Sequence, residues 1–285
     1  MYEHILVATD GSDRTRGAVA HALGVAERYG ATVHALYVVD SRALTIDEDG
    51  FGDYDQLVTA LEERGERATE SIAQQAEARG LATRTAVAHG TPARGIRQYA
   101  DDHEIDLIAM GTQGRTGLAR YVLGSVSESV LRKADQPVLT VNRAATTVDP
   151  SYDRILLPTD GSGHAGRVAD HAFDIAARYD ATVHALSVID ENLIRSPDLL
   201  ATLERESDAA LTAARERGEA AGVDVVARVW RGAPYDCITT YASERDIDLV
   251  TMGAHGKRGL HRFLTQNTAE RVVRRAPCPV WTLRR

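Results

Sequence analysis

The stretch IDLIAMGTQGRTGLARYVLGSVSESVL, residues 105–131, decides the fold of this chain. It opens with a short apolar run that ends at Met110, and such a run predicts a buried strand. It closes with a predicted helix start, because Ser125 is a good N-cap and Glu128 follows three residues later, as in a capping box. A strand, a glycine-containing loop and a helix therefore follow one another here.

The glycines of this stretch are Gly111, Gly114 and Gly124, in the spacing Gly-x2-Gly-x9-Gly-Ser. Backbone N–H groups at a helix N-terminus attract anions, and glycine allows the backbone to approach a ligand closely. A plain glycine-rich connection is the alternative interpretation. The position of the spacing, directly after a predicted strand, favours a site for nucleotide phosphates.

Length and composition restrict the class of protein. The 285 residues suffice for two ordinary domains, and the net charge of -8 argues against a nucleic-acid binder, which needs a basic face. No apolar run approaches the ~18 residues of a membrane span, so we expect no membrane association. The first predicted strand starts near residue 4, without a visible signal peptide, and we expect a cytoplasmic protein. Cys237 and Cys278 lie far apart and are expected to act as small apolar residues.

The chain contains an internal repeat. YEHILVATDGS at 2–12 matches YDRILLPTDGS at 152–162, and IDLIAMG at 105–111 matches IDLVTMG at 247–253. The first match has an offset of 150 and the second an offset of 142, so the second copy lacks eight residues in between. We predict two tandem domains, residues 1–143 and 152–285, joined by a short polar linker.

Each copy alternates predicted strands and helices. An apolar stripe with helical spacing follows the first strand, at Val19, Ala22, Leu23 and Ala26. In the first copy we expect strands over 5–8, 32–39, 83–88, 105–110 and 138–141, and helices over the apolar stripe, over 55–79, from Pro92 onward and over 125–133. Alternation of this kind predicts an α/β fold with a doubly wound parallel sheet and helices on both faces. The acidic segment 41–54 is expected to be a surface loop beside the site.

In open α/β sheets, ligands bind outside the carboxyl ends of the strands. Asp10 follows the first strand, and it would face the glycine loop if the first and fourth strands are neighbours. It is then placed to accept hydrogen bonds from a ribose or to approach a phosphate-bound cation. Alternatively Asp10, or equally Ser12, caps the first helix. Arg115 and Arg120 lie inside the loop, either to balance phosphate charge or as ordinary surface residues.

These motifs resemble the universal stress protein family, and the whole chain is similar to a tandem two-domain member. The resemblance rests on VATDGS at 7–12, on VVD at 38–40 and on the complete glycine pattern of 111–125. It implies two five-stranded sheets with strand order 3-2-1-4-5. It also implies pairing through the last strand, here between the two halves of one chain or in a homodimer.

The resemblance further implies an ATP site in the first domain. Asp10 would face the ribose and the glycine loop would meet the phosphates. The complete set expected to bind the nucleotide is Ala8, Thr9, Asp10, Val38, Met110, Gly111, Gly114, Arg115, Gly124, Ser125 and Val126. Among these, Ala8, Val38 and Met110 would lie by the adenine, and Gly111, Gly114, Gly124, Ser125 and Val126 would contact the phosphates.

The second copy departs from the pattern. Gln266 replaces the third glycine and Asn267 replaces the serine, while Glu270 keeps a predicted capping box with Asn267. A glutamine side chain would project where phosphate and backbone must touch. We therefore expect weak or no ATP binding in the second domain.

We expect a nucleotide-dependent regulator of the stress-response type that binds ATP, with ADP or AMP as related ligands, Mg2+ as an accompanying cation and a protein partner that the sequence does not identify. A slow ATPase or nucleotide-dependent transferase is the enzymatic alternative, and a non-binding interaction scaffold is the third. The chain contains neither a GxxxxGK[ST] phosphate loop nor an HExxH zinc motif. We therefore expect at most weak ATP hydrolysis and assign no catalytic or metal-ligating residue. His34 and His184 lie mid-strand, where packing is the expected role.

Overall fold

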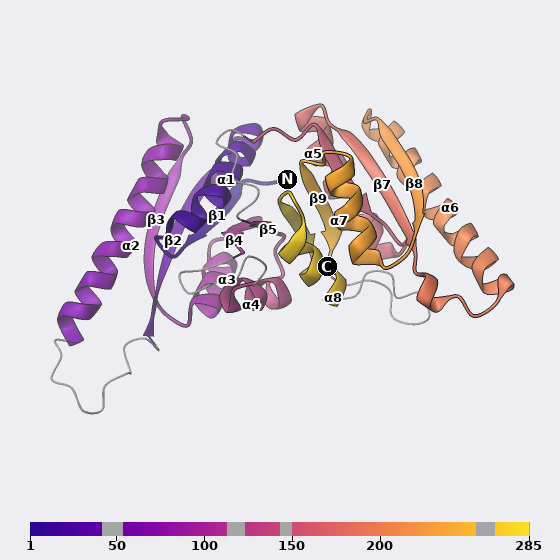
Figure 1. Cartoon of the computed structure of the whole chain (residues 1–285). Helices are drawn as coiled ribbons and strands as arrows, with labels where there is room; N and C mark the ends of the chain where they lie inside the picture. The colour runs from indigo at the N-terminus through magenta and orange to yellow at the C-terminus, as the bar shows by residue number, and fades with distance from the viewer. Residues whose placement is uncertain (42–53, 113–122, 143–149, 255–265, 285) are drawn as a thin grey trace. The chain divides into compact units, whose positions relative to one another are not determined.

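The computed structural model of the protein describes residues 1–41, 54–112, 123–142, 150–254 and 266–284 (Figure 1). The chain divides into two compact units, residues 1–150 and 151–285, which we call unit 1 and unit 2. The expected surface loop at 41–54 and the predicted linker fall largely outside the described residues. No helix in the described ranges is both long and apolar enough to cross a membrane.

Unit 1 alternates strands and helices as predicted. Its elements are β1 (His4–Thr9), α1 (Arg16–Tyr29), β2 (Thr32–Asp40), α2 (Tyr54–Glu77), β3 (Thr83–Gly90), α3 (Pro92–Asp102), β4 (Leu107–Gly111), α4 (Ser125–Lys133) and β5 (Val138–Val141). A 3-10 turn over Asp13–Thr15 precedes α1. Pro92 occupies the first turn of α3, where its missing N–H costs nothing.

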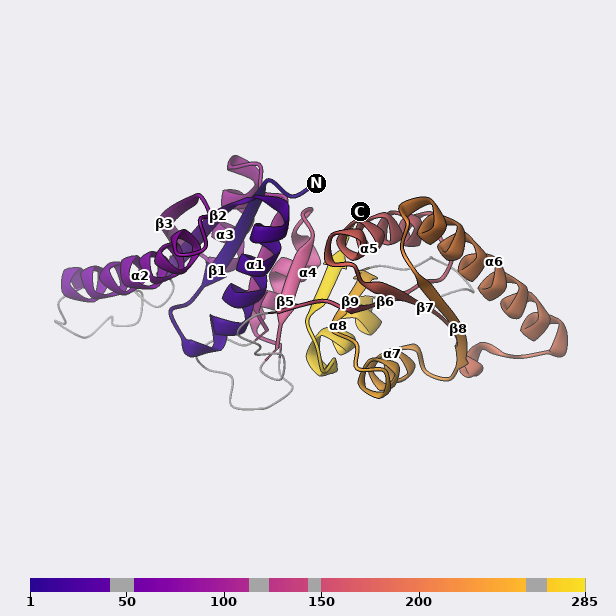
Figure 2. The ribbon, with the colours of Figure 1, turned by 90° about the horizontal axis from the view of Figure 1, so that it is seen from above.

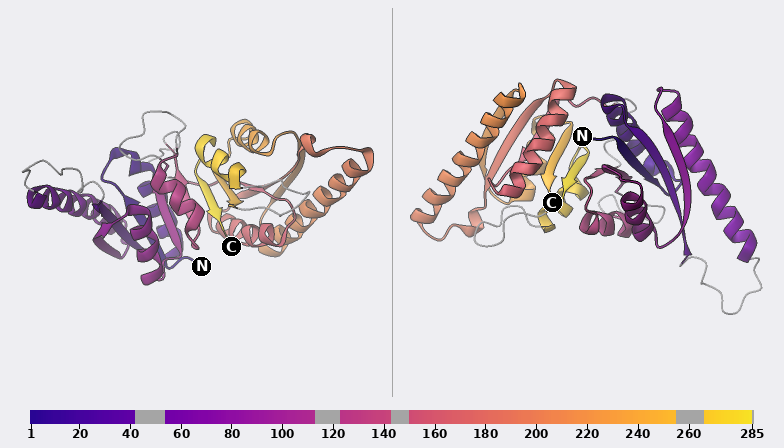
Figure 3. Two further views of the ribbon diagram at one scale, coloured as in Figure 1. Left: turned by 90° about the horizontal axis from the view of Figure 1, so that it is seen from below. Right: turned by 180° about the vertical axis from the view of Figure 1, so that it is seen from behind.

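Unit 2 repeats this order. Its elements are β6 (Arg154–Pro158), α5 (Gly163–Tyr179), β7 (Thr182–Ile189), α6 (Pro197–Ala221), β8 (Val225–Arg231), α7 (Pro234–Glu244), β9 (Leu249–Gly253), α8 (Gln266–Arg275) and β10 (Val280–Leu283). Figure 3 gives two further views, in which the long helices α2 (purple) and α6 (coral) each flank the outer strands of their own unit. Val33 pairs with Thr83 and Val183 pairs with Val225, so the eight missing residues fall between β7 and β8, as the repeat predicts.

All strand pairs within each unit are parallel. The order in unit 1 is β3-β2-β1-β4-β5, and the order in unit 2 is β8-β7-β6-β9-β10. The strand order therefore reverses beside β1 in unit 1, between β1 and β4. Ligand crevices of doubly wound folds lie at such a reversal, at the carboxyl ends of the strands.

The helices of unit 1 cover both faces of the sheet (Figure 2). Gly65 of α2 lies against Tyr37, whereas Gly95 of α3 lies against Val38. Because successive side chains of a strand point to opposite faces, α2 and α3 must lie on opposite sides of the sheet. The predicted apolar stripe of α1 is buried, with its four members at most 5% exposed.

The helix α4 spans the predicted residues 125–133, but its N-cap differs from the prediction. The N-cap is Gly124 rather than Ser125, and its backbone is extended. The Gly124 N–H donates to the Thr112 carbonyl across the loop, and this tertiary contact holds Gly124 at the helix start. Glu128 forms an ion pair with Arg132. In unit 2, Asn267 likewise lies inside α8, which begins at Gln266.

Three ring side chains, His4, His34 and Tyr99, are joined by hydrogen bonds near the amino ends of β1 and β2. The His34 side chain is fully buried, with ring nitrogens 3.2 Å from His4 Nδ1 and 3.1 Å from the Tyr99 hydroxyl. Burial, followed by the positive charges of His4, Arg84 and His103, lowers the pKa of His34 to about 4. Packing is thus the role of His34, as predicted.

This cluster predicts that unit 1 loses stability in acid. The folded-state pKa of His34 lies below its unfolded value of 6.5, so its contribution is complete above pH 6.5 and is lost as the pH falls toward 4. At pH 5 the loss should reach about 2 kcal/mol. Urea unfolding followed by hydrogen exchange in β2 should show this loss in the wild type and not in His34→Gln. The matched variant His184→Gln should leave the acid response of β2 intact, and a response equal in all three proteins would contradict the assignment.

Candidate functional site

The candidate site lies where β1 and β4 end. Ala8 of β1 pairs in register with Met110 of β4, so both strands reach the same edge of the sheet. Asp10 and Gly111 follow directly at that edge. The neighbouring strands that the sequence argument required are therefore present in unit 1.

Ala8, Val38 and Met110 share one face of the sheet. Ala8 pairs in register with both Met110 and Leu36, and Val38 is two residues beyond Leu36. Side chains in register on neighbouring parallel strands, and those two residues apart on one strand, point to the same side. Val38 packs against Gly95 of α3, so this is the α3 face. The three strands together form an apolar shelf beside the strand ends.

Two hydrogen bonds hold the start of α4 against the end of β4. The Gly124 N–H donates to the Thr112 carbonyl at 2.7 Å, and the buried Ser127 hydroxyl donates to the Gly111 carbonyl at 2.8 Å. The two ends of the glycine loop are thereby brought to one place. The first turn of α4 is positioned next to the apolar shelf.

The helix start carries the predicted phosphate contacts Gly124, Ser125 and Val126. Ser125 is exposed and the other two are half-buried. The first N–H groups of a helix have no intrahelical partners, and the N-cap Gly124 has no side chain that could cap them. Such a start favours an anion through both hydrogen bonding and the helix dipole. Gly114, Arg115 and Arg120 lie outside the described residues.

Asp10 and Thr9 occupy the turn after β1 in different ways. The Asp10 Oδ1 accepts a hydrogen bond from the Ser12 N–H at 3.0 Å, and Asp160 forms the same turn with Ser162 in unit 2. Asp10 therefore shapes this turn, and its carboxylate remains at the strand edge. The Thr9 hydroxyl accepts from the Gly11 N–H and lies 3.2 Å from the Thr15 hydroxyl. Thr9 lines a cavity on the α1 face, so its side chain is separated from the apolar shelf.

Unit 2 keeps the shelf and changes the helix start. Val188, Met252 and Gly253 stand where unit 1 has Val38, Met110 and Gly111, with Pro158 in place of Ala8. The hydroxyl of Ser127 has no equivalent, because the corresponding residue is the buried Ala269. The Ala254 N–H still donates to the Leu283 carbonyl, as the Thr112 N–H does to Val141.

Ser127 is the residue that the sequence argument missed. Its position is only 4% exposed, and its bond to Gly111 joins two parts of the glycine motif. A serine on the buried side of a short helix was a detectable signal, because buried hydroxyls require a partner. The identity of that partner depends on the fold.

The two cysteines are buried and unbonded to each other. Burial raises the pKa of Cys237 and raises that of Cys278 to about 12. Both thiols therefore stay protonated near neutral pH and are poor nucleophiles. This agrees with the predicted role as small apolar residues.

The protein is of the doubly wound α/β class, in two tandem copies. In unit 1 an apolar shelf lies beside the start of α4. A model described as "Universal stress protein family" matches residues 1–142 and 151–284. The chain is 30% identical over 294 residues to a universal stress protein of Mycolicibacterium smegmatis, which covers 98% of this chain and 96% of that protein. It is 38% identical over 143 residues to Universal stress protein MJ0531 of Methanocaldococcus jannaschii, with 50% of this chain and 84% of that protein covered.

A solved structure supports the same assignment over both copies. The crystal structure of a universal stress protein from Archaeoglobus fulgidus matches with a TM-score of 0.76 and 25% identity, covering 99% of this chain and 96% of that one. This chain belongs to the universal stress protein family, and it contains two tandem copies of the family domain. The resemblance drawn from VATDGS and the glycine motif is therefore confirmed.

Proposed function

We propose that unit 1 binds ATP or a related adenine nucleotide and that the protein acts as a nucleotide-dependent regulator in stress response. The observation that carries this proposal is the meeting of an apolar shelf and a helix start with a glycine N-cap at one sheet edge. Val38 is half-buried beside the buried Ala8 and Met110, and a flat base would lie against this apolar face. The first turn of α4 offers N–H groups to phosphates.

The two parts lie at the same edge of the sheet. The shelf lies at the ends of β1, β2 and β4, and the hydrogen bonds of Gly124 and Ser127 hold α4 beside β4. Asp10, at the end of β1, supplies a carboxylate that accepts hydrogen bonds from ribose hydroxyls. Mg2+ would accompany the phosphates without a dedicated protein ligand in this assignment.

Unit 2 is proposed to bind the nucleotide weakly or not at all. Gln266 begins α8 where unit 1 has the N-cap Gly124. Ala269 stands at the position of Ser127, so unit 2 lacks the hydroxyl that in unit 1 donates to the Gly111 carbonyl. The fold of the unit is retained while its helix start is altered.

We predict a stoichiometry of one tight ATP per chain. Calorimetric titration of the full chain should give a single site, because only unit 1 combines the glycine motif with Ser127. A control with Gln266→Gly in unit 2 tests whether the glutamine alone blocks that site. Two equal sites in the wild type would show that Gln266 and Asn267 are tolerated, and absence of any binding would favour the scaffold alternative.

A further inference from the structure

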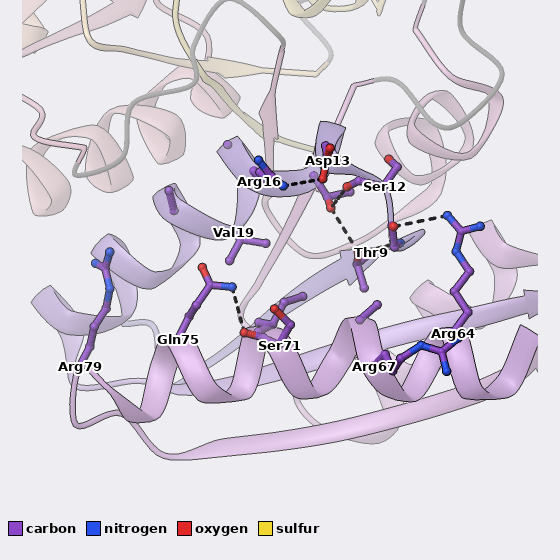
Figure 4. Close-up of a pocket in the computed structure, with 16 residues that line it drawn as sticks. Thr9, Ser12, Asp13, Arg16, Val19, Arg64, Arg67, Ser71, Gln75 and Arg79 are labelled. Atoms are coloured by element: carbon purple, nitrogen blue, oxygen red, sulfur yellow. Dashed lines mark hydrogen bonds and ion pairs between the residues drawn. The ribbon is translucent and has the colours of Figure 1, made fainter.

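A cavity of unit 1 borders the turn after β1, as the candidate nucleotide site does, but extends over the other face of the sheet from the apolar shelf. It measures about 780 Å³ and runs between α1 and α2, with the turn after β1 at one end (Figure 4). Small-molecule sites typically measure ~300–1,000 Å³. We call it the α1–α2 groove; Val19 and Ala20 line it from α1, and Ala68 and Ile72 from α2. It lies on the face opposite to the shelf of Val38.

The groove is apolar at its base and basic at its ends. Val19 and Ile72 are 5% and 4% exposed. The side chains of Ala20 and Ala68 are small, so they leave the space between the two helices open. Figure 4 shows Arg64 at one end and Arg79 at the other. The described lining contains four arginines, one acidic residue and no aromatic ring. A flat base has no stacking partner here, whereas an aliphatic chain has apolar contacts along the groove.

The arginines near the turn after β1 are held loosely. Arg64 donates to the Gly11 carbonyl at 3.3 Å, and Arg67 forms a 3.3 Å ion pair with Glu63 on its own helix. The side chains of Arg67 and Glu63 are 69% and 58% exposed, and such exposed pairs contribute little to stability. Both guanidinium groups can therefore turn toward an anion in the groove at little cost.

A hydroxyl without a partner lies at the same end. Ser12 Oγ lines the groove and is shielded from solvent, yet it forms no hydrogen bond within the described part of the chain. In unit 2 the equivalent Ser162 Oγ accepts from the Ala165 N–H at 3.1 Å. Buried polar groups normally have partners. The unmet hydroxyl marks a position where a ligand oxygen would be bound.

Unit 2 provides an internal comparison. Its groove between α5 and α6 measures about 270 Å³. Glu206 and Ala209 stand at the positions of Arg64 and Arg67, and Asp170 stands at the position of Ala20. Asp170 also forms an ion pair with Arg217 across that groove. The width and the positive charge are therefore properties of unit 1 and not of the shared fold.

We propose that the α1–α2 groove of unit 1 binds an organic anion with an aliphatic body. The carboxylate or phosphate head group lies at Arg64, Arg67 and Ser12, and the aliphatic part lies over Val19 and Ile72. Gln75 is about 16 Å from Arg64 along the helix axis, which accommodates a chain of medium length. Because the groove and the shelf occupy opposite faces, the anion and a nucleotide can be bound at the same time, with the turn after β1 between them.

The test is calorimetric titration of the full chain with decanoate and with decyl phosphate, and with decanol as the uncharged analogue. We expect one site per chain, with decanol at least tenfold weaker than the better anion. The anion that binds more tightly shows whether the site prefers a carboxylate or a phosphate head group. Saturating ATP should not displace the anion, because the apolar shelf lies on the other face. Failure of the nucleotide proposal would therefore leave this result intact.

Variants locate the site. The double change Arg64→Gln with Arg67→Gln should weaken binding at least tenfold, and Ala20→Asp, which copies Asp170, should weaken it similarly. The matched control Arg215→Gln removes an exposed arginine of α6 and should have no effect. The proposal is overturned if neither anion binds, if decanol binds as well as they do, if ATP competes, or if the folded groove variants retain wild-type affinity.

Discussion

Replacing Gly124 with glutamine should lower the affinity of unit 1 for ATP at least tenfold, about 1.4 kcal/mol or more. Gly124 is the N-cap of α4, so the N–H groups of the first helical turn follow it directly. The substitution copies Gln266, which begins α8 in unit 2. A glutamine side chain at this position would occupy the space that a phosphate needs.

The fold should survive this change. The backbone of Gly124 has φ -63 and ψ 145, an extended conformation that any residue adopts. The stability of the ligand-free protein should therefore change by no more than about 1 kcal/mol. Calorimetric ATP titration and ligand-free unfolding of the same variant decide the question. Ser129→Gln is the matched control, since it places the same side chain further along α4, where unit 2 has Arg271. Unchanged ATP affinity in Gly124→Gln would mean that the glycine loop is only a turn.

The second large effect concerns the packing of α2 on β2. A Cβ added at Gly65 would lie 2.7 Å from Tyr37 Cδ1, so the ring fills the space that the glycine leaves. Tyr37 is 2% exposed. Unit 2 solves the same contact differently, with the buried Ser187 hydroxyl donating to the Ser207 hydroxyl at 3.0 Å. The two residues of each pair therefore fit each other in size. A pair made of one residue from each unit would leave a cavity or a clash.

Single changes at this contact should be costly. Tyr37→Ser should destabilise unit 1 by about 3–5 kcal/mol through the cavity that it leaves, and Gly65→Ser by about 1–3 kcal/mol through overpacking. The double variant recreates the Ser187–Ser207 pair and should cost at least ~1 kcal/mol less than the sum. Both tryptophans lie in unit 2, so hydrogen exchange in β2 and α2 is the suitable measurement. Additive costs in the double variant would contradict the matched-pair interpretation.

Some boundaries of helices and strands could be predicted from neighbouring residues alone. The start of α3 follows from Pro92, and the bounds of the strand β5 follow from the apolar run at 138–141. The N-cap of α4 is Gly124 and not the predicted Ser125, because the Gly124 N–H finds its acceptor at Thr112 across the loop. Capping signals describe only neighbouring residues and cannot include such a partner.

The sequence by itself determined the duplication, the alternation of strands and helices, and the difference between the two glycine motifs. Those features are written in residues close to one another or in the comparison of one copy with the other. Only the tertiary structure decided that Ala8, Val38 and Met110 share a face while Thr9 points to the other, because register and pleat join strands distant in the chain. It also decided the α1–α2 groove, since the space between two helices depends on side chains from both and on the sheet that holds them apart.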